Sequence, residues 1–150
     1  MSVAERFAIL FGIGRIPYVP GTAASLIALP FAWLIATAFG SIPLLALDMA
    51  IGLLAIPIAG NYEKKSGRED PSDCVIDELA GQWLACAFAP LTLWGYLLSF
   101  VLFRLFDIAK PWPVSAAERL HGGLGIVADD MVAGAMAGVI VLLTVHFGLL

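Results

Sequence analysis

Charged side chains are scarce in this chain. Asp, Glu, Lys and Arg together make up 13% of its 150 residues, whereas an ordinary soluble domain contains about 25%. So few charges could hardly cover the surface of a water-soluble domain of this size. Hydrophobic residues make up 61%, so we expect the bilayer to be the solvent for much of the surface. The length suits a single domain, which we expect to cover residues 1–150.

Basic residues and cysteines are also few. The eight Lys and Arg residues form no run, and the net charge is −4, so no nucleic-acid partner is expected. Cys74 and Cys86 lack the spacing of a metal site. We interpret both as small hydrophobic residues rather than as a disulfide.

Long apolar segments dominate the rest of the sequence. A helix that crosses a bilayer needs about 20 mostly apolar residues, and three segments suit this role: Ala23–Phe39, Ile42–Gly60 and Met131–Leu150. A further uncharged stretch, Leu79–Phe103, is interrupted at Pro90, and proline disrupts a helix interior. We therefore predict a hairpin of two short helices, 77–89 and 93–108, each roughly 20 Å long. That length is short for a full crossing, so a tilted or partly re-entrant hairpin stays open.

The predicted fold is an all-α, polytopic membrane bundle of about five helices. Its orientation follows from the basic residues, because Lys and Arg accumulate on the cytoplasmic side of membrane proteins. With five helices and a cytoplasmic N-terminus, every basic residue falls on that side: Arg6, Arg15, Lys64, Lys65, Arg68, Arg104, Lys110 and Arg119. A single long middle helix would instead move Arg104 and Lys110 to the opposite side.

Five acidic residues lie near helix ends that this topology brings to the cytoplasmic face. Asp77 and Glu78 open the third predicted helix, Asp107 lies near the end of the fourth, and Asp129 and Asp130 open the fifth. Clustered carboxylates repel one another unless protons or a cation hold them together. Hard oxygen ligands suit Mg²⁺ or Mn²⁺. For each pair alone, an acidic N-terminal cap is the alternative, but the whole set favours a metal and catalytic site.

Two basic residues accompany Asp107 on the fourth predicted helix. Arg104 and Lys110 lie three residues before and after Asp107, so all three follow one side of the helix. Phosphate chemistry needs positive charge near the transferred group, which both residues could supply. Anchoring at lipid headgroups is the alternative role.

Three more polar residues are candidates, and one acid is not. Thr22 and Ser25 stand in the small-residue start of the first spanning helix, where backbone N–H groups can bind an anion; an ordinary cap is the alternative. His121 begins the glycine-rich stretch His121–Gly125 and is either a proton donor or a surface histidine. Asp48 lies near the outer end of the second apolar segment, too far from the other acids, and we leave it outside the site.

Four segments, taken in order, resemble the phosphatidylglycerophosphatase A family. They are Val19-Pro20-Gly21-Thr22 through Leu26, Val75–Gly81, Phe103–Pro113 and His121–Asp130. The combination Arg-x-x-Asp-x-x-Lys-Pro-Trp-Pro, followed by His-Gly-Gly-x-Gly-Ile and an Asp pair, is specific, and the similarity covers nearly the whole chain. Ala24 stands where the family commonly has Gly, and Ile76 and Ala109 stand where it has Trp. None of these departures removes an ionisable group.

The resemblance implies a reaction and a location. An enzyme of this family would remove the terminal phosphate of phosphatidylglycerophosphate and leave phosphatidylglycerol, with Mg²⁺ required. Its substrate is a membrane lipid, so the implied location is the bacterial cytoplasmic (inner) membrane, with the active site facing the cytoplasm. Protein partners and the breadth of lipid specificity stay open.

The residues and the resemblance together lead to working roles. The metal and catalytic set is Asp77, Glu78, Asp107, Asp129 and Asp130. The substrate-binding set is Thr22, Ser25, Arg104 and Lys110. His121 is the candidate donor of a proton to the leaving glycerol oxygen. One carboxylate would either activate water or attack phosphorus, and this choice and the number of metal ions stay open.

A small cation-binding transporter or channel subunit is the alternative function. Paired acids fit it, as do the small-residue helix faces around Gly134 and Gly138, which favour close helix packing. A transporter, however, places ionisable groups near the bilayer midplane. Here they are predicted to collect at helix ends on one side, so we prefer the phosphatase.

Overall fold

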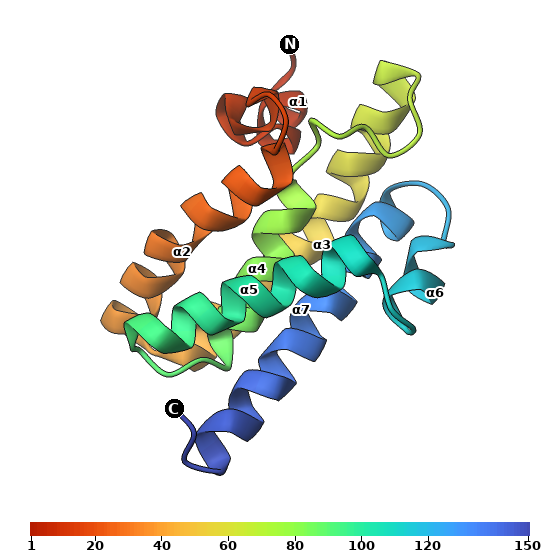
Figure 1. Ribbon diagram of the computed structural model, residues 1–150. Helices are drawn as coiled ribbons and strands as arrows, with labels where there is room; N and C mark the ends of the chain where they lie inside the picture. The colour runs from red at the N-terminus through yellow and green to blue at the C-terminus, as the bar shows by residue number, and fades with distance from the viewer.

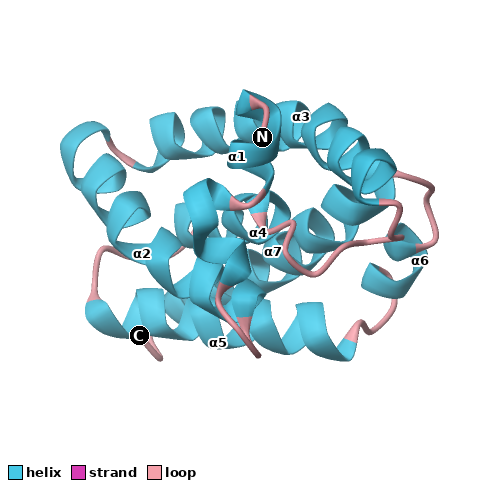
Figure 2. Ribbon diagram, turned by 90° about the horizontal axis from the view of Figure 1, so that it is seen from above, coloured by secondary structure: helices cyan, strands magenta, loops and turns pink.

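A computed structural model describes residues 1–150, and it is helical throughout, without strands (Figure 1, Figure 2). Five elements correspond to the five predicted helices: α2 (Pro20–Phe39), α3 (Ser41–Ser66), α4 (Ile76–Ala87), α5 (Leu93–Ala109) and α7 (Gly123–His146). Three short elements were not predicted: α1 (Val3–Ala8), the 3-10 helix η1 (Leu10–Arg15) and α6 (Val114–Glu118). The all-α class is confirmed, with more helical elements than expected.

Proline and glycine set the limits of the first two long helices. Pro20 stands in the first turn of α2, where its missing N–H costs nothing. Gly40 has a φ of 96° and forms the tight turn into α3, between the first two predicted apolar segments. α3 then continues past the predicted end at Gly60 and stops at Gly67, whose left-handed φ of 65° is typical of a helix C-terminus.

The middle of the chain forms the predicted hairpin of short helices. α4 has 12 residues and α5 has 17, so they are about 18 and 26 Å long. Thr92 caps α5, because its hydroxyl accepts a hydrogen bond of 3.1 Å from the backbone N–H of Gly95. By length and composition only α2, α3 and α7 are suited to cross a membrane.

The start of α7 corrects one prediction. α7 begins at Gly123 rather than at Met131, so Asp129 and Asp130 lie in its second turn and do not open it. A Cβ atom on Gly123 would collide with the backbone of α3 at Ile56 and Gly60. The glycine-rich segment therefore belongs to the helix, and the glycines allow its close approach to α3. Acidic capping cannot explain this Asp pair, because dipole effects fade beyond the first turn.

α4 is the centre of the bundle. It packs most extensively against α7 and also contacts α2, α3 and α5, and nine of its 12 residues are buried. α4 and α7 touch through their backbones, since a Cβ atom on Gly134 would overlap the carbonyl oxygen of Gly81. Small residues allow such close packing between membrane helices.

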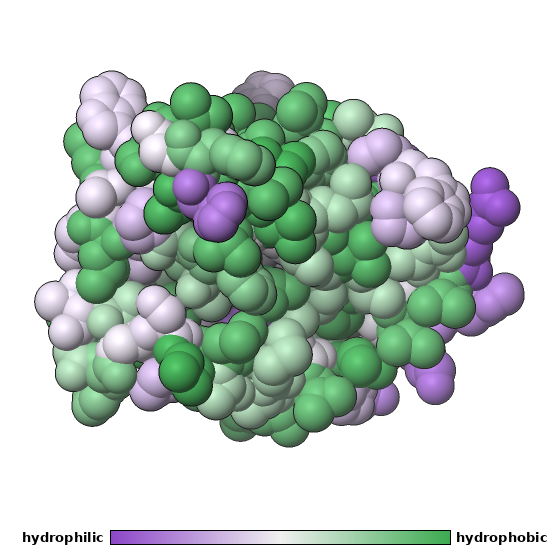
Figure 3. Space-filling model, turned by 90° about the horizontal axis from the view of Figure 1, so that it is seen from below, coloured by the Kyte–Doolittle hydropathy of each residue, from purple (hydrophilic) through white to green (hydrophobic).

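The outer surface is largely apolar. Large hydrophobic side chains are exposed along α2, α3, α5 and α7, among them Leu34, Leu53, Val101 and Leu142. The face seen in Figure 3 is mostly hydrophobic, and most of its strongly hydrophilic groups lie at one edge. We call that end of the molecule the polar end: it contains the start of α2, the end of α3, the start of α4, the end of α5 and the start of α7 (Figure 1). Its placement at the cytoplasmic face stays a prediction from the basic residues.

Candidate active site

A cavity of about 340 Å³ opens at the polar end, between the starts of α2 and α4, the end of α5 and the second turn of α7. It is lined by eight of the ten predicted site residues: Thr22, Asp77, Glu78, Arg104, Asp107, Lys110, Asp129 and Asp130. We call it the carboxylate cavity. The fold thus brings four separate segments of the chain to one place.

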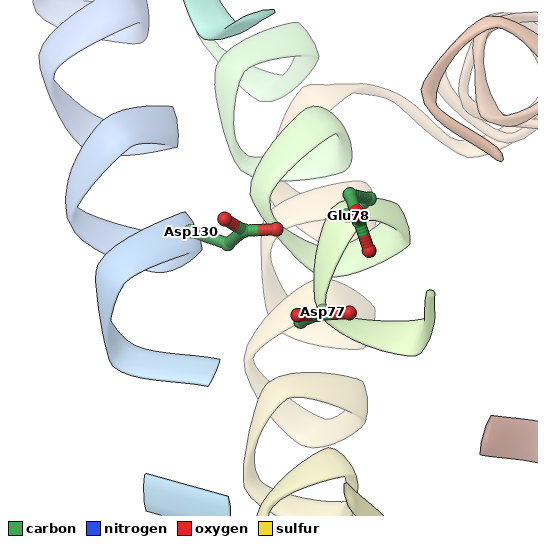
Figure 4. Close-up of side chains that lie close together, drawn as sticks. All are labelled: Asp77, Glu78 and Asp130. Atoms are coloured by element: carbon green, nitrogen blue, oxygen red, sulfur yellow. The ribbon is translucent and has the colours of Figure 1, made fainter. Parts of the chain in front are cut away.

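The backbone contact between α4 and α7 explains how two of these acids meet. Asp77 lies four residues before Gly81, and Asp130 lies four residues before Gly134. In each helix, a spacing of four residues places the aspartate and the glycine on the same face, one turn apart. The Gly81–Gly134 contact therefore places Asp77 and Asp130 side by side, and Figure 4 shows Asp130 reaching from α7 towards Asp77 and Glu78 on α4.

The acids form two overlapping groups. Ligand oxygens of Asp77, Glu78 and Asp130 lie within 4.8 Å of one another, and the same holds for Asp107, Asp129 and Asp130. Asp130 belongs to both groups and is only 3% exposed. One oxygen each of Asp77, Glu78 and Asp130 is buried without a hydrogen-bond donor. Buried polar atoms in proteins are normally satisfied, so these oxygens are suited to bind a cation.

The two basic residues are held by the site's own carboxylates. Arg104 Nη1 lies 2.5 Å from Asp107 Oδ2, and the buried Nε of Arg104 has no partner. Lys110 follows the last residue of α5 with a φ of 47°, and its Nζ donates to both Asp129 Oδ2 and Glu118 Oε1 at 2.8 Å. Burial lowers the pKa of Lys110, but these two hydrogen bonds outweigh it and raise that pKa above its usual value.

The formal charge of the carboxylate cavity is strongly negative. Its lining contains six acids, the five predicted ones and Asp70, but only two cations, Arg104 and Lys110. This leaves an excess of four negative charges when all groups are ionised. A phosphate monoester adds further negative charge at neutral pH. Binding such a group here therefore requires a cation or protons to offset the repulsion.

Gly21 was given no role of its own in the prediction from sequence, where it appeared only within a family motif. In the structure it allows α2 to approach the acids. A Cβ atom at this position would overlap Glu78 Oε1 and press against Arg104 Nη2. Only a residue without a side chain therefore fits between the first turn of α2 and the Glu78 carboxylate. The signal in the sequence was the glycine immediately after Pro20.

A loop between α3 and α4 adds lining residues that sequence reasoning missed. Asp70, Ser72 and Cys74 all line the carboxylate cavity. The loop is fixed by Asp73, which accepts hydrogen bonds from Tyr62 and, at 2.8 Å, from Arg68. Burial raises the pKa of Asp73, but these bonds outweigh it and hold that pKa below its usual value. The segment has no periodic pattern from which its position could be predicted.

Two predicted residues lie outside this lining. The buried Ser25 hydroxyl donates to the backbone carbonyl of Gly21 at 2.8 Å, so it supports the first turn of α2. His121 is exposed and lines a neighbouring polar cavity of about 450 Å³ together with Glu63, Glu118 and Arg119. Asp70 and Asp129 line both cavities, which therefore adjoin at these two acids.

Asp48 lies nearer the Ser41 end of α3 than its other end. It is fully buried, and neither of its oxygens accepts a hydrogen bond. It lies on α3, remote from the carboxylate cavity and not among its lining residues. Leaving it out of the site agrees with this placement.

Comparison with known proteins shows the family. The model of the family Phosphatidylglycerophosphatase A matches residues 6–145. The chain is 37% identical over 146 residues to the phosphatidylglycerophosphatase A of Escherichia coli K12, covering 95% of this chain and 84% of that protein. It is 32% identical over 152 residues to the phosphatidylglycerophosphatase A of Haemophilus influenzae Rd, covering 100% and 93%.

A third relative carries a different name. A Bacteroides thetaiotaomicron protein, whose name provisionally gives it phosphatidylinositol-3-phosphatase activity, is 35% identical over 140 residues, covering 87% of this chain and 86% of that protein. No solved structure matches the chain. The family match contains every residue that lines the carboxylate cavity. The chain therefore belongs to the phosphatidylglycerophosphatase A family.

Proposed function

We propose that this chain removes the terminal phosphate of phosphatidylglycerophosphate and leaves phosphatidylglycerol, with Mg²⁺ held by the acids of the carboxylate cavity, at the cytoplasmic face of the membrane. The family is named for phosphatidylglycerophosphatase, a phosphoric monoester hydrolase. The observation that carries the proposal is the position of Asp130, which is shared by two groups of acids beside Arg104 and Lys110.

The donor set fits a hard divalent cation. Three buried carboxylate oxygens lack a hydrogen-bond donor, one each on Asp77, Glu78 and Asp130, and Mg²⁺ prefers such oxygens. Asp107 and Asp129 complete the second group around Asp130. When bound, Mg²⁺ supplies positive charge that stabilises the phosphoryl oxygens.

The basic residues bind and orient the phosphate. Asp107 fixes the guanidinium of Arg104, and Asp129 fixes the ammonium of Lys110. Both cations are thus positioned before substrate binds, which favours hydrogen bonds to the nonbridging phosphate oxygens. Thr22 lies in the same lining, where its hydroxyl can contact the phosphate, while Ser25 acts through the backbone of Gly21.

A proton must move during the reaction, and the acids are placed to take it. One carboxylate either removes a proton from the attacking water or attacks phosphorus itself. Trapping a phosphorylated aspartate, or its absence in a single turnover, separates the two routes. His121 stays the proposed proton donor to the leaving glycerol oxygen. Because His121 lines the neighbouring cavity, this role requires that oxygen to lie where the two cavities adjoin, beside Asp129.

A cation transporter is not favoured by the chain's family. A transport site would need ionisable groups near the middle of the membrane. The residues that line the carboxylate cavity instead lie at or near helix ends, and these ends gather on one side of the bundle (Figure 1).

The test is phosphate release by the purified protein in detergent, with and without Mg²⁺. We expect release from phosphatidylglycerophosphate that depends on Mg²⁺ and is lost in Asp130→Asn, whereas Asp48→Asn serves as a control with an equally buried acid. Phosphatidylinositol 3-phosphate, assayed in parallel, tests the activity named for the Bacteroides relative. No release by a well-folded wild type with Mg²⁺ or Mn²⁺ would contradict the proposal.

A further inference from the structure

α2 and α5 both contribute to the carboxylate cavity and both continue away from it. At the far end the two helices meet, with the rings of Trp33 and Tyr96 4.9 Å apart. Towards the polar end they diverge, with α4 lying behind them (Figure 1). Any molecule held between these two helices would have one end at the carboxylates.

On α2 a single face runs from the carboxylate cavity to an apolar cavity. Thr22 lines the carboxylate cavity, and Leu29 and Trp33 line a second cavity of about 160 Å³ whose lining is almost entirely hydrophobic. Leu26 lies between them and is 53% exposed. The spacings of four, three and four residues place all four side chains on one side of the helix.

α5 repeats this arrangement. Leu97 lines the apolar cavity, whereas Arg104 and Ile108 line the carboxylate cavity. Val101 lies between them and is 57% exposed. The spacings are again four, three and four residues, so these side chains also share one face. The two faces together are called the α2–α5 seam below.

We infer that the α2–α5 seam holds the acyl chains of the lipid whose phosphate occupies the carboxylate cavity. This inference rests on the proposed function and names how the substrate is positioned. The seam is charged where the phosphate binds and apolar where it ends, which is the polarity of a phospholipid. Thr22 to Trp33 spans 11 residues, about 17 Å, and one leaflet of the hydrocarbon core is about 15 Å thick.

The surroundings of the seam favour a lipid over a protein helix. A helix packed along the seam would cover Thr22 and Arg104 and close the cavity to any substrate. Lipid chains from the surrounding bilayer can instead enter sideways past the exposed Leu26 and Val101 and leave the same way. Ile108, 70% exposed at the mouth of the cavity, extends this apolar path up to the carboxylates.

A larger apolar groove of about 450 Å³ lies on the other side of α2, lined by residues of η1, α3 and α4 such as Ile13, Ile51 and Leu79. It is separated from the carboxylates by direct contacts between α2 and α4. Trp83 Nε1 donates to the carbonyl of Ala28 at 2.9 Å, and Gly21 lies against Glu78. The chains of a substrate bound at the carboxylates therefore follow the seam and not this groove.

The test fills the seam and compares two substrates. Phosphatidylglycerophosphate with sixteen-carbon chains depends on the seam, whereas the same lipid with six-carbon chains has little to place there. We expect Val101→Trp to lower kcat/KM for the long-chain substrate by about tenfold or more, a typical cost of a misfit in an apolar site. The same variant should change the short-chain reaction less than twofold. Val139→Trp is the matched control, because Val139 is a similarly exposed valine on α7, and neither reaction should change.

The outcomes separate the inference from the proposed function. If Val101→Trp lowers kcat/KM equally for both substrates, or for neither, the seam does not hold the acyl chains. The proposed phosphatase activity would be unaffected by that result. A wild type that hydrolyses neither substrate would overturn the proposed function and the seam with it. Val101→Ala is a second variant that removes side-chain volume and therefore cannot disturb the helix packing by added bulk. It should raise KM for the long-chain substrate without changing kcat.

Discussion

α4 carries two groups of buried polar side chains, and the two groups differ in chemistry. At its start, Asp77 and Glu78 meet Asp130 beside two cations and an open cavity. Further along the helix, about 8 and 14 Å from Asp77, Gln82 and Cys86 lie against Ser99. Asp48 is as deeply buried as Asp130, yet it has no ion pair and no hydrogen-bond donor.

The two buried acids, Asp48 and Asp130, differ in what surrounds them rather than in how deeply they are buried. An acid within a membrane protein is a functional candidate by default, and by that measure Asp48 and Asp130 rank equally. Asp130 differs from Asp48 because other functional groups lie around it. It belongs to two groups of three acids, Arg104 and Lys110 lie in the same lining, and the cavity has space for a ligand. The predictions below test whether enzymatic activity depends on this clustering of groups or on the burial of an acid alone.

The largest effect is expected for Asp77→Asn. This change keeps the shape of the side chain but removes one cation ligand, so phosphate release should fall by more than about 100-fold, beyond the usual cost of losing a supporting group around a metal. Because the acids repel one another without a cation, the thermal midpoint of the metal-free variant should not fall below that of the wild type. Mg²⁺ should raise the midpoint of the wild type but not of the variant. A variant that retains activity would show that Asp77 is not a ligand.

Gly21→Ala should have the next largest effect. The added methyl group would overlap the Glu78 carboxylate and displace it, and small displacements of catalytic groups can cost between about 10- and 100-fold in rate. Gly52→Ala is the control, because its new methyl group would meet only the flexible end of Met131. Steady-state phosphate release from both variants measures the difference. Equal activities would mean that Glu78 moves without consequence.

Lys110→Met should have a moderate effect, mainly on KM. Losing one charge-assisted hydrogen bond to phosphate should raise KM about tenfold in steady-state phosphate release. Lys65→Met is the control: it removes only an exposed ion pair with Glu5, so its KM should change little.

The pH profile tests the same residue. Because the pKa of Lys110 is raised in the folded protein, its charge and its bonds to Asp129 and Glu118 are complete below the ordinary lysine pKa of about 10.4 and are lost only above it. Phosphate release should therefore show no lysine titration below about pH 10. A falling limb below that pH that disappears in Lys110→Met would contradict this assignment.

The smallest effect is expected for Asp48→Asn. An unpaired, ionised carboxylate is very costly in an apolar interior, so replacing it with a neutral group of the same shape should change the free energy of unfolding by less than about 1 kcal/mol. Activity should stay within twofold of the wild type by the same assay. A large loss of activity without a loss of stability would assign a role to the buried acid and weaken the distinction from Asp130.

Local patterns in the sequence determined much of this protein. Low charge and long apolar segments predicted an all-helical membrane bundle, and Pro90 marked the connection of its short hairpin. Both signals are local, because solvent preference and backbone breakers act over short distances. The spaced motifs around Asp77, Asp107 and Asp129 identified the family, and they contain eight of the 16 residues that line the cavity. Such motifs are visible in sequence because each functional group lies within a few residues of the next.

Only the tertiary structure decided how these groups meet. That Asp129 and Asp130 lie in the second turn of α7 depends on the packing of Gly123 against α3. The pairing of Asp77 with Asp130 depends on the contact between Gly81 and Gly134, which lie 53 positions apart in the chain. Whether two distant backbones can touch is set by the packing of the whole bundle, and no local pattern encodes it. The same reason placed His121 beside the carboxylate cavity and enclosed Asp48 away from it.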